Sequence, residues 1–252
     1  MAQALSVVLV GQDAAALLPA CLASVAFADD VVVVDSGSSD DTAACAAQHG
    51  ARVVRHDWMG FGRQKQFAVG QARNDWVLCL DADERVSPEL DRSIRAALEA
   101  PVSPVYRMRR RNRFLGRWLK HGEGYPDWST RLFDRKNAAW SDDPVHEKVL
   151  TDAPVARLRG DLLHDSADTI AGYLDKQNRY TSMQAEALFK AGKRAGVAQL
   201  LLSPALRFAK FYFLRLGFLD GAAGLVHIAI GCCNSFHKYA KLMALQQHRE
   251  RM

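Results

Sequence analysis

The sequence has few of the features that mark secreted, disulfide-bonded or membrane-spanning proteins. Its 252 residues include five cysteines, an odd number at irregular spacings, which predicts neither a disulfide framework nor a zinc site and fits a reducing cytosol. The N-terminus has no basic segment followed by a long apolar run, so we expect no signal peptide. The longest uncharged stretch, Gly221–Phe236, is shorter than the roughly 20 apolar residues of a spanning helix, so we expect no membrane span.

A glycine-rich, basic phosphate loop is also missing. The first predicted strand is followed by Val10–Ala14 (Val-Gly-Gln-Asp-Ala), which is not such a loop and argues against a nucleotidyltransferase, the second enzyme hypothesis. Internal repeats and low-complexity segments are absent as well. The composition, 49% hydrophobic and 24% charged, is that of an ordinary globular protein with a sizeable core.

Positive charge is present and unevenly distributed. The formal net charge is +5 and the basic residues concentrate after about residue 105, most densely in Arg107–Arg113. A basic surface attracts nucleic acid, phosphorylated sugars and acidic membranes. If this run is a strand, alternate arginines share one face and suit a phosphorylated acceptor. A solvated or lipid-facing run is the equal alternative.

The order of predicted elements indicates an α/β fold. Short β-branched runs alternate with helical patterns through the first hundred residues, which predicts βαβ units and a mostly parallel sheet. Short aromatic and basic segments follow from Pro101, and the chain is predicted helical from Thr169, with breaks at Pro204 and at the glycines of 217–224. We therefore expect a catalytic domain over residues 1–168, with a donor half (1–100) and an acceptor half (101–168), and a helical region over 169–252.

Acidic residues follow two predicted strands directly. Asp35 follows the valines of Val31–Val34, and Asp81–Asp83 (Asp-Ala-Asp) follows Asp75–Leu80. Ligands of parallel sheets bind beyond the carboxyl ends of the strands, so both segments can line one crevice. Paired carboxylates there suit Mg²⁺ or Mn²⁺ bound to a nucleotide diphosphate. An Asx turn at Asp35 and a solvated helix N-terminus at Asp81–Asp83 are the alternatives.

Several motifs together resemble one enzyme family. They are Val31–Thr42, Trp58–Lys65, Asp75–Glu84, Val145–Glu147, Phe218–Gly221 and Lys238–Leu242. The chain resembles the family 2 glycosyltransferases, which have the GT-A nucleotide-diphospho-sugar transferase fold, and more narrowly the bacterial lipopolysaccharide core glucosyltransferases. One departure is Gly11–Asp13, where relatives have an Asn-x-Glu type sequence.

The resemblance implies a metal-dependent, inverting transfer of a sugar, glucose from UDP-glucose, onto a lipopolysaccharide inner-core or related lipid-linked acceptor. It implies a divalent metal, Mg²⁺ or Mn²⁺, held by Asp83 and by His164, for which a structural histidine is the alternative. Donor-binding positions would be Val10, Asp13, Asp35, Gln64, Lys65, Asp81, Ala82 and Asp83. Candidates for the catalytic base on the acceptor side are Glu147, Asp142, Asp143 and His146, with Glu147 preferred. Acceptor-binding candidates are Arg109, Arg111, Trp128 and Arg131.

The C-terminal region predicts a location. Leu200–Arg215 mixes bulky apolar and aromatic residues with regularly placed cations, a pattern that can lie in the interface of an anionic bilayer. Packing on the catalytic domain or on another subunit is the alternative. We expect a cytoplasmic protein, peripheral on the cytoplasmic face of the inner membrane, with no nucleic-acid partner. A non-catalytic nucleic-acid or membrane-binding protein, the third hypothesis, has no need of acidic residues at strand ends.

Overall fold

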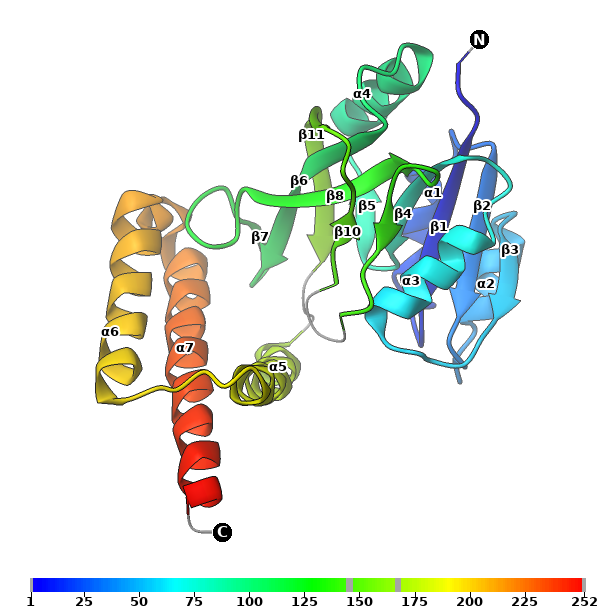
Figure 1. Cartoon of the computed structure of the whole chain (residues 1–252). Coiled ribbons are helices and arrows are strands. Elements are labelled where there is room, and N and C mark those ends of the chain that lie inside the picture. The colour runs from blue at the N-terminus through cyan, green and yellow to red at the C-terminus, as the bar shows by residue number, and fades with distance from the viewer. Residues whose placement is uncertain (1, 144–146, 166–168, 251–252) are drawn as a thin grey trace. The chain divides into compact units, whose positions relative to one another are not determined.

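The chain forms two compact units (Figure 1). The computed structural model describes residues 2–143, 147–165 and 169–250. The sheet unit contains Met1–Arg110 and Trp128–His164, and the helical unit contains Arg111–Asp127 and Asp165–Met252. The segment Arg111–Asp127, which the sequence pattern places in the acceptor half, is therefore grouped with the C-terminal helices.

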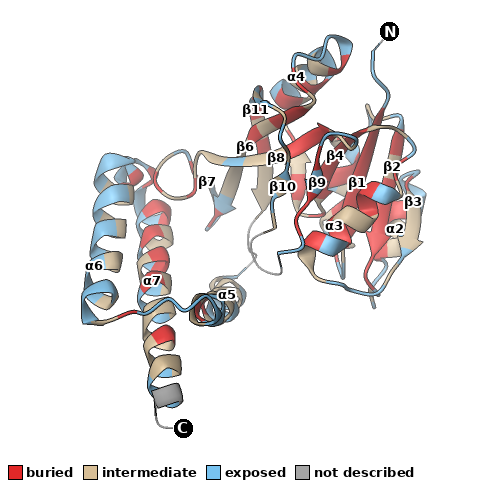
Figure 2. Ribbon diagram, viewed as in Figure 1, coloured by how far each residue is buried: buried red, intermediate tan, exposed pale blue. Residues whose placement is uncertain are grey.

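Four parallel strands form one half of the sheet. They are β1 (Leu5–Gly11), β2 (Asp30–Asp35), β3 (Arg52–Arg55) and β4 (Trp76–Asp81), in the spatial order β3-β2-β1-β4. β1, β2 and β4 are buried along nearly their whole length, which explains their continuous β-branched and apolar runs (Figure 2). The α/β prediction with parallel βα units is confirmed.

The strand register brings the predicted acidic residues to one edge. Val10 of β1 is paired with Val34 on one side and with Asp81 on the other. Gly11, the next residue, is paired with Asp35. The two carboxylates thus lie on either side of the end of β1, at the carboxyl edge of the parallel strands, where α/β proteins bind their ligands.

Helices cover both faces of these strands. Alternate strand residues divide between two hydrophobic clusters, with Leu9 in one and Val8 in the other, because successive side chains of a strand point to opposite faces. Helices α1 (Leu18–Ala23), α2 (Thr42–Gln48) and α4 (Pro88–Glu99) contribute to the first cluster, and α3 (Phe61–Gly70) to the second.

The remaining strands extend the sheet beyond β4. They are β5 (Glu84–Val86), β6 (Val105–Phe114), β7 (Arg117–Trp118), β8 (Asp127–Asp134) and β11 (Val155–Asp165), and the order continues β4-β8-β6-β11-β5, with β7 on β6. β9 (Ala139–Trp140) and β10 (Val149–Leu150) form a separate antiparallel pair. The arginine run is therefore part of a strand, β6, in which Tyr106 and Met108 are buried and the arginines are not.

The helical unit is built around its last helix. α5 (Ile170–Lys190) and α6 (Val197–Phe208) both pack against α7 (Gly221–Glu250). A π-helical segment (Ala209–Leu214) and a 3₁₀ turn (Gly217–Asp220) join α6 to α7. The expected break at Pro204 is wrong, because packing on α7 offsets the hydrogen bond that proline removes. The buried Asp220 carboxylate accepts the backbone N–H groups of Lys120 and His121, at 2.9 and 2.7 Å.

Among the described residues, one helix, Gly217–His248, has the length and composition to cross a membrane. Its most apolar window has a mean hydropathy of 1.2 and is 44% buried inside the structure. The core helix of a bundle meets the same test. No residue of α6, by contrast, is buried (Figure 2).

We expect Gly160→Ala to destabilise the sheet unit. Gly160 in β11 has φ +87°, and a Cβ there would lie 2.3 Å from the backbone nitrogen of Leu90 in α4. Backbone strain and overpacking together cost about 2–5 kcal/mol of unfolding free energy, measurable by urea denaturation. Gly70→Ala, with nothing within 4 Å of its Cβ, is the matched control and should leave stability unchanged or slightly higher. Equal stability of the two variants would contradict the prediction.

Candidate active site

Asp35 presents a buried acceptor at the end of β2. Its Oδ1 accepts hydrogen bonds from the backbone N–H of Ser38, at 3.1 Å, and from the Ser38 hydroxyl. Its Oδ2 is buried and accepts no hydrogen bond from the described residues, and the Arg55 Nε lies 3.6 Å from it. Buried carboxylate oxygens are normally paired, so the unpaired Oδ2 makes Asp35 a candidate for contact with a ligand at the strand ends.

Asp81 lies between two cations. The Lys65 Nζ is 3.0 Å from its Oδ1, and the Arg131 Nη2 is 2.9 Å from its Oδ2. Burial opposes ionisation of this carboxyl, but the two cations outweigh burial and hold the pKa of Asp81 well below its usual range. Arg131 also contacts the fully buried Glu84, at 2.9 Å from Oε1. Burial disfavours the charge of Arg131, yet Glu84 and Asp81 raise its pKa.

Lys65 joins the two predicted halves of the site. Its Nζ lies 2.9 Å from the Oε1 of Glu147, so one buried ammonium contacts both Asp81 and Glu147. The ring of Trp140 lies under Lys65, at 5.0 Å, and under Arg131, at 5.5 Å, which favours both cations through the face of the indole. The candidate base on the acceptor side is thereby held next to the strand-end aspartate.

Asp83 and His164 also lie together. The His164 Nε2 is 3.3 Å from the Asp83 Oδ2, while the Asp83 Oδ1 is buried without a hydrogen-bond partner. No group of three or more His, Cys, Asp or Glu side chains that could hold a metal occurs within the described ranges. Two protein ligands suffice for a cation such as Mg²⁺, which is commonly held by one or two carboxylates together with substrate phosphates. The pair therefore fits a cation that arrives with a diphosphate.

The close approach of α3 to the residue after β9 depends on a glycine. A Cβ at Gly62, in the first turn of α3, would lie 1.9 Å from the carbonyl oxygen of Ser141. Gln64, two residues further on, is fully buried and donates to the Ser36 hydroxyl at 3.1 Å and to the His56 carbonyl at 3.3 Å. The Gln64 amide thus connects α3 to the segments that contain Ser36 and His56. The donor-binding role of Gln64 stays a prediction.

The other donor-side candidates line the same strand ends. Val10 and Ala82 are buried, with Ala82 in contact with the position of a Gly11 Cβ. Asp13 is exposed and has φ 48°. Its Oδ1 accepts from the backbone N–H and the hydroxyl of Ser39, at 2.7 and 3.0 Å, which connects the loops after β1 and β2.

The acceptor-side candidates do not form one cluster. Arg109 is paired with Asp161 at 3.1 Å, Arg111 belongs to the helical unit and donates to the Leu119 carbonyl, and Arg131 lies in the buried carboxylate cluster. Trp128 is 37% exposed, and its ring is contacted by the guanidinium groups of Arg107 and Arg157 at 5.2 and 5.0 Å. Their roles toward an acceptor stay predictions.

Among the other base candidates, Asp142 is exposed and paired with the exposed Arg63 at 3.2 Å, and Asp143 is exposed. His146 lies outside the described residues. Two members of the cluster, Glu84 and Trp140, are not among the predicted site residues. Glu84 ends the motif Asp75–Glu84, but the sequence assigns it no role.

The fold and the site define a glycosyltransferase of the GT-A type, with a strand-end carboxylate cluster beside a curled α/β sheet. The model of the family "Glycosyl transferase family 2" matches residues 6–157, more than half of the sequence. The chain belongs to this family, as the sequence motifs predict.

Two relatives cover most of the chain. An uncharacterised glycosyltransferase of Rickettsia prowazekii is 31% identical over 237 residues, 86% of this chain and 78% of the relative. The lipopolysaccharide core biosynthesis glycosyltransferase LpsC of Rhizobium meliloti is 28% identical over 235 residues, 90% of this chain and 87% of LpsC. Residues 1–349 of TarS from S. aureus share the fold, with a TM-score of 0.50 at 16% identity over 99% of this chain and 92% of that one.

We expect Glu84→Gln to destabilise the protein strongly. The substitution leaves Arg131 buried with one compensating carboxylate fewer, and breaking a buried ion pair costs about 3–5 kcal/mol of unfolding free energy. Asp91→Asn, which removes the more exposed Asp91–Arg95 pair in α4, is the control and should cost less than about 1 kcal/mol. Urea denaturation at pH 7 gives the unfolding free energy of both variants. An equally small loss in both would show that the Glu84–Arg131 pair contributes little to stability.

Proposed function

We propose that this enzyme is an inverting, metal-dependent glycosyltransferase that moves glucose from UDP-glucose onto a lipopolysaccharide inner-core sugar or a related lipid-linked glycan. The observation that carries the proposal is that the Lys65 ammonium contacts both Asp81 and Glu147. It gathers a donor-side and an acceptor-side carboxylate into one site. The similarity to LpsC over 90% of the chain supports the acceptor class.

On the donor side, the orphaned Oδ2 of Asp35 would accept a hydrogen bond from the base or ribose of the nucleotide. Asp83 and His164 would hold Mg²⁺ or Mn²⁺ with the diphosphate. When bound, the cation supplies positive charge that stabilises the departing diphosphate. Asp81 stays ionised at neutral pH because Lys65 and Arg131 flank it.

On the acceptor side, Glu147 would act as the general base. It takes the proton of the acceptor hydroxyl while that oxygen forms a bond to the anomeric carbon and the bond from this carbon to the diphosphate oxygen breaks. A single displacement of this kind inverts the anomeric configuration. Lys65 orients the Glu147 carboxylate through their contact of 2.9 Å. Asp142 and Asp143 are the alternative bases and lie exposed on the preceding segment.

The helical unit would place the enzyme at the cytoplasmic face of the inner membrane. Large apolar side chains are exposed on α6 and the segment after it, namely Leu201, Leu202, Leu206, Phe213 and Leu214. Lys210 and Arg215 lie in the same stretch of chain. Exposed apolar side chains with neighbouring cations favour the interface of an anionic bilayer. This location supports a lipid-linked acceptor.

Asp83→Asn tests the metal site. We expect UDP-glucose with Mn²⁺ to raise the melting temperature of the wild-type protein, because a ligand that binds only the folded state stabilises it, and we expect EDTA to remove the metal-dependent part. Asp83→Asn should lose that part, while Asp152→Asn, an exposed aspartate in the same unit, should keep it. An unchanged metal-dependent shift in Asp83→Asn would exclude Asp83 as a ligand.

Glu147→Gln tests the base. Glutamine keeps an acceptor for Lys65 but cannot take a proton, so we expect kcat for transfer to fall by about 10²–10⁴-fold with little change in UDP-glucose binding. Transfer to a lipopolysaccharide-core acceptor and UDP release are the measurements. If Glu147→Gln keeps near-normal kcat while Asp142→Asn or Asp143→Asn loses it, the base is one of those aspartates.

A further inference from the structure

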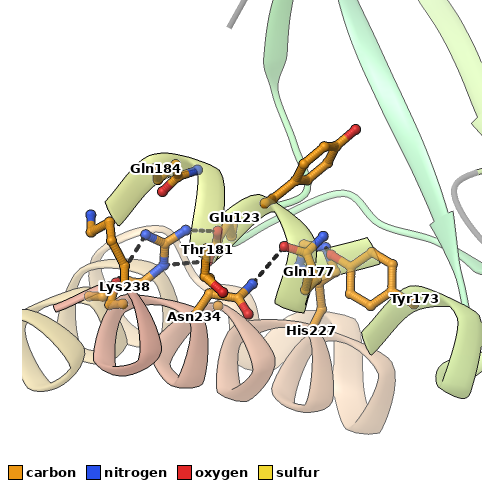
Figure 3. A pocket seen from close by; sticks show the side chains of 12 residues that line it. Glu123, Tyr173, Gln177, Thr181, Gln184, His227, Asn234 and Lys238 are labelled. Carbon is orange, nitrogen blue, oxygen red and sulfur yellow. Dashed lines mark hydrogen bonds and ion pairs between the residues drawn. The ribbon is translucent and has the colours of Figure 1, made fainter. Parts of the chain in front are cut away.

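A polar cavity of about 220 Å³ lies inside the helical unit (Figure 3). Side chains of α5, α6 and α7 line it, together with Glu123 from the segment before β8. Every lining residue belongs to the helical unit, so the cavity is separate from the carboxylate cluster of the sheet unit. The proposed transfer reaction does not use it, and of the sequence motifs only Lys238–Leu242 contributes a lining residue, Lys238.

The cavity replaces an apolar helix interface. Five α5 residues line it, and of these Tyr173, Gln177, Thr181 and Gln184 follow each other at intervals of three or four and share one face of the helix, with Tyr180 beside them. His227, Gly231, Asn234 and Lys238 do the same on α7, with Ser235 beside them. The faces of packed helices are normally apolar. Here both facing surfaces are polar for roughly three turns.

Apolar clusters adjoin this polar stretch, and the first of them includes Ile230, which lies between His227 and Gly231 in the sequence. Ala223 and Ile230 of α7 pack with Phe114 and Leu119 in one cluster. Ala185 of α5 and Leu242 of α7 pack together in the other. The helix pair thus forms ordinary apolar contacts beside the cavity. Of the polar side chains between them, Thr181 and Ser235 are buried, and Gln177 and Asn234 are half-buried. Polar groups in such an interface stabilise it less than apolar packing does, which is consistent with a role in ligand binding.

Part of the lining is already paired. Arg207 of α6 contacts Glu123 through both ends of its guanidinium, with its Nε 3.0 Å from the Oε2. Gly231 makes room for this pair, since a Cβ there would lie 2.4 Å from the same oxygen. The Asn234 amide donates to the Gln177 Oε1 at 2.8 Å, and Figure 3 shows these two side chains meeting across the helices.

Other groups are left for a ligand. The Nδ1 of His227 is buried and has no hydrogen-bond partner in the described part of the chain, while its Nε2 lies 3.3 Å from the Tyr173 hydroxyl. The Gln184 amide has no partner among those residues, and the Lys238 ammonium, 4.6 Å from the ring of Tyr239, has no ion pair among them. The cavity therefore offers donors, acceptors and one uncompensated cation.

The lining chemistry selects the class of ligand. Amides and hydroxyls both donate and accept, as the hydroxyls of a sugar do, and Tyr173 and Tyr180 add ring surface. Glu123 cancels Arg207, which leaves Lys238 as one net positive charge suited to a single phosphate or carboxylate. The volume is below the range of about 300–1,000 Å³ of pockets for drug-sized ligands, so it suits one sugar ring rather than a nucleotide sugar.

We propose that this cavity binds one sugar residue that carries a single negative charge, with Gln177, Asn234 and Gln184 contacting its hydroxyls and Lys238 its anionic group. The site is distinct from donor binding and does not depend on the transfer reaction. A charged sugar bound here would tie a glycan to the helical unit.

Isothermal titration of the full chain, without nucleotide or metal, tests the proposal. We expect glucose 6-phosphate or glucuronate to bind at least 10-fold more tightly than glucose and than inorganic phosphate; the two charged sugars show whether phosphate or carboxylate is preferred. Gln177→Leu with Asn234→Leu should lose at least 10-fold in affinity. Its melting temperature should be kept or raised, because both partners of the hydrogen bond are replaced by apolar groups of similar size.

Two further variants complete the test. Gln247→Leu, the same substitution at an exposed position of α7, should keep the wild-type affinity. Lys238→Met should lose the preference for charged over neutral sugars. This measurement tests the proposal even if the double variant fails to fold. Absence of binding by both charged sugars to the wild-type chain, or unchanged affinity in the double variant, overturns the proposal. Stabilisation by UDP-glucose with Mn²⁺, measured in the same double variant, reports on the sheet unit separately.

Discussion

The contacts of two buried cations with three carboxylates support the rest of the site. Lys65 and Arg131 share Asp81, and each adds one further acid, Glu147 and Glu84 respectively. Without the cations, these carboxylates would repel one another and resist burial. With them, acids from β4, from β5 and from the segment before β10 converge, and Trp140 packs against both cations.

The backbone makes this convergence possible. The register of β1 between β2 and β4 brings Asp35 and Asp81 to the same edge, and Gly62 lets α3 approach close enough for Lys65 to contact Glu147. Most charges of the site are paired within the protein, but two carboxylate oxygens are not. These are the Oδ2 of Asp35 and the Oδ1 of Asp83, both buried and without hydrogen-bond partners among the described residues, and both suited to a nucleotide and its cation.

The helical unit likewise contains polar groups of which some are paired and others are not. Its polar stretch is compensated by Glu123–Arg207 and by Gln177–Asn234, and the groups without partners again indicate a ligand. The two units differ in what they present outward. The strand ends of the sheet unit present acidic side chains, whereas α6 and the segment after it expose apolar side chains between cations.

The sequence alone determined the family, the parallel βα units and the position of Asp35 and Asp81 at strand ends, because buried strands and the turns after them have local, periodic patterns. It did not determine the partners of the functional side chains. Lys65 contacts Glu147 across 82 positions of the chain, Gln64 faces inward to loops, and Arg131 contacts Glu84 rather than a surface ligand. The polar cavity likewise arises only when α5 and α7 pack face to face. Such contacts depend on strand register and helix packing between distant segments, which no local pattern specifies.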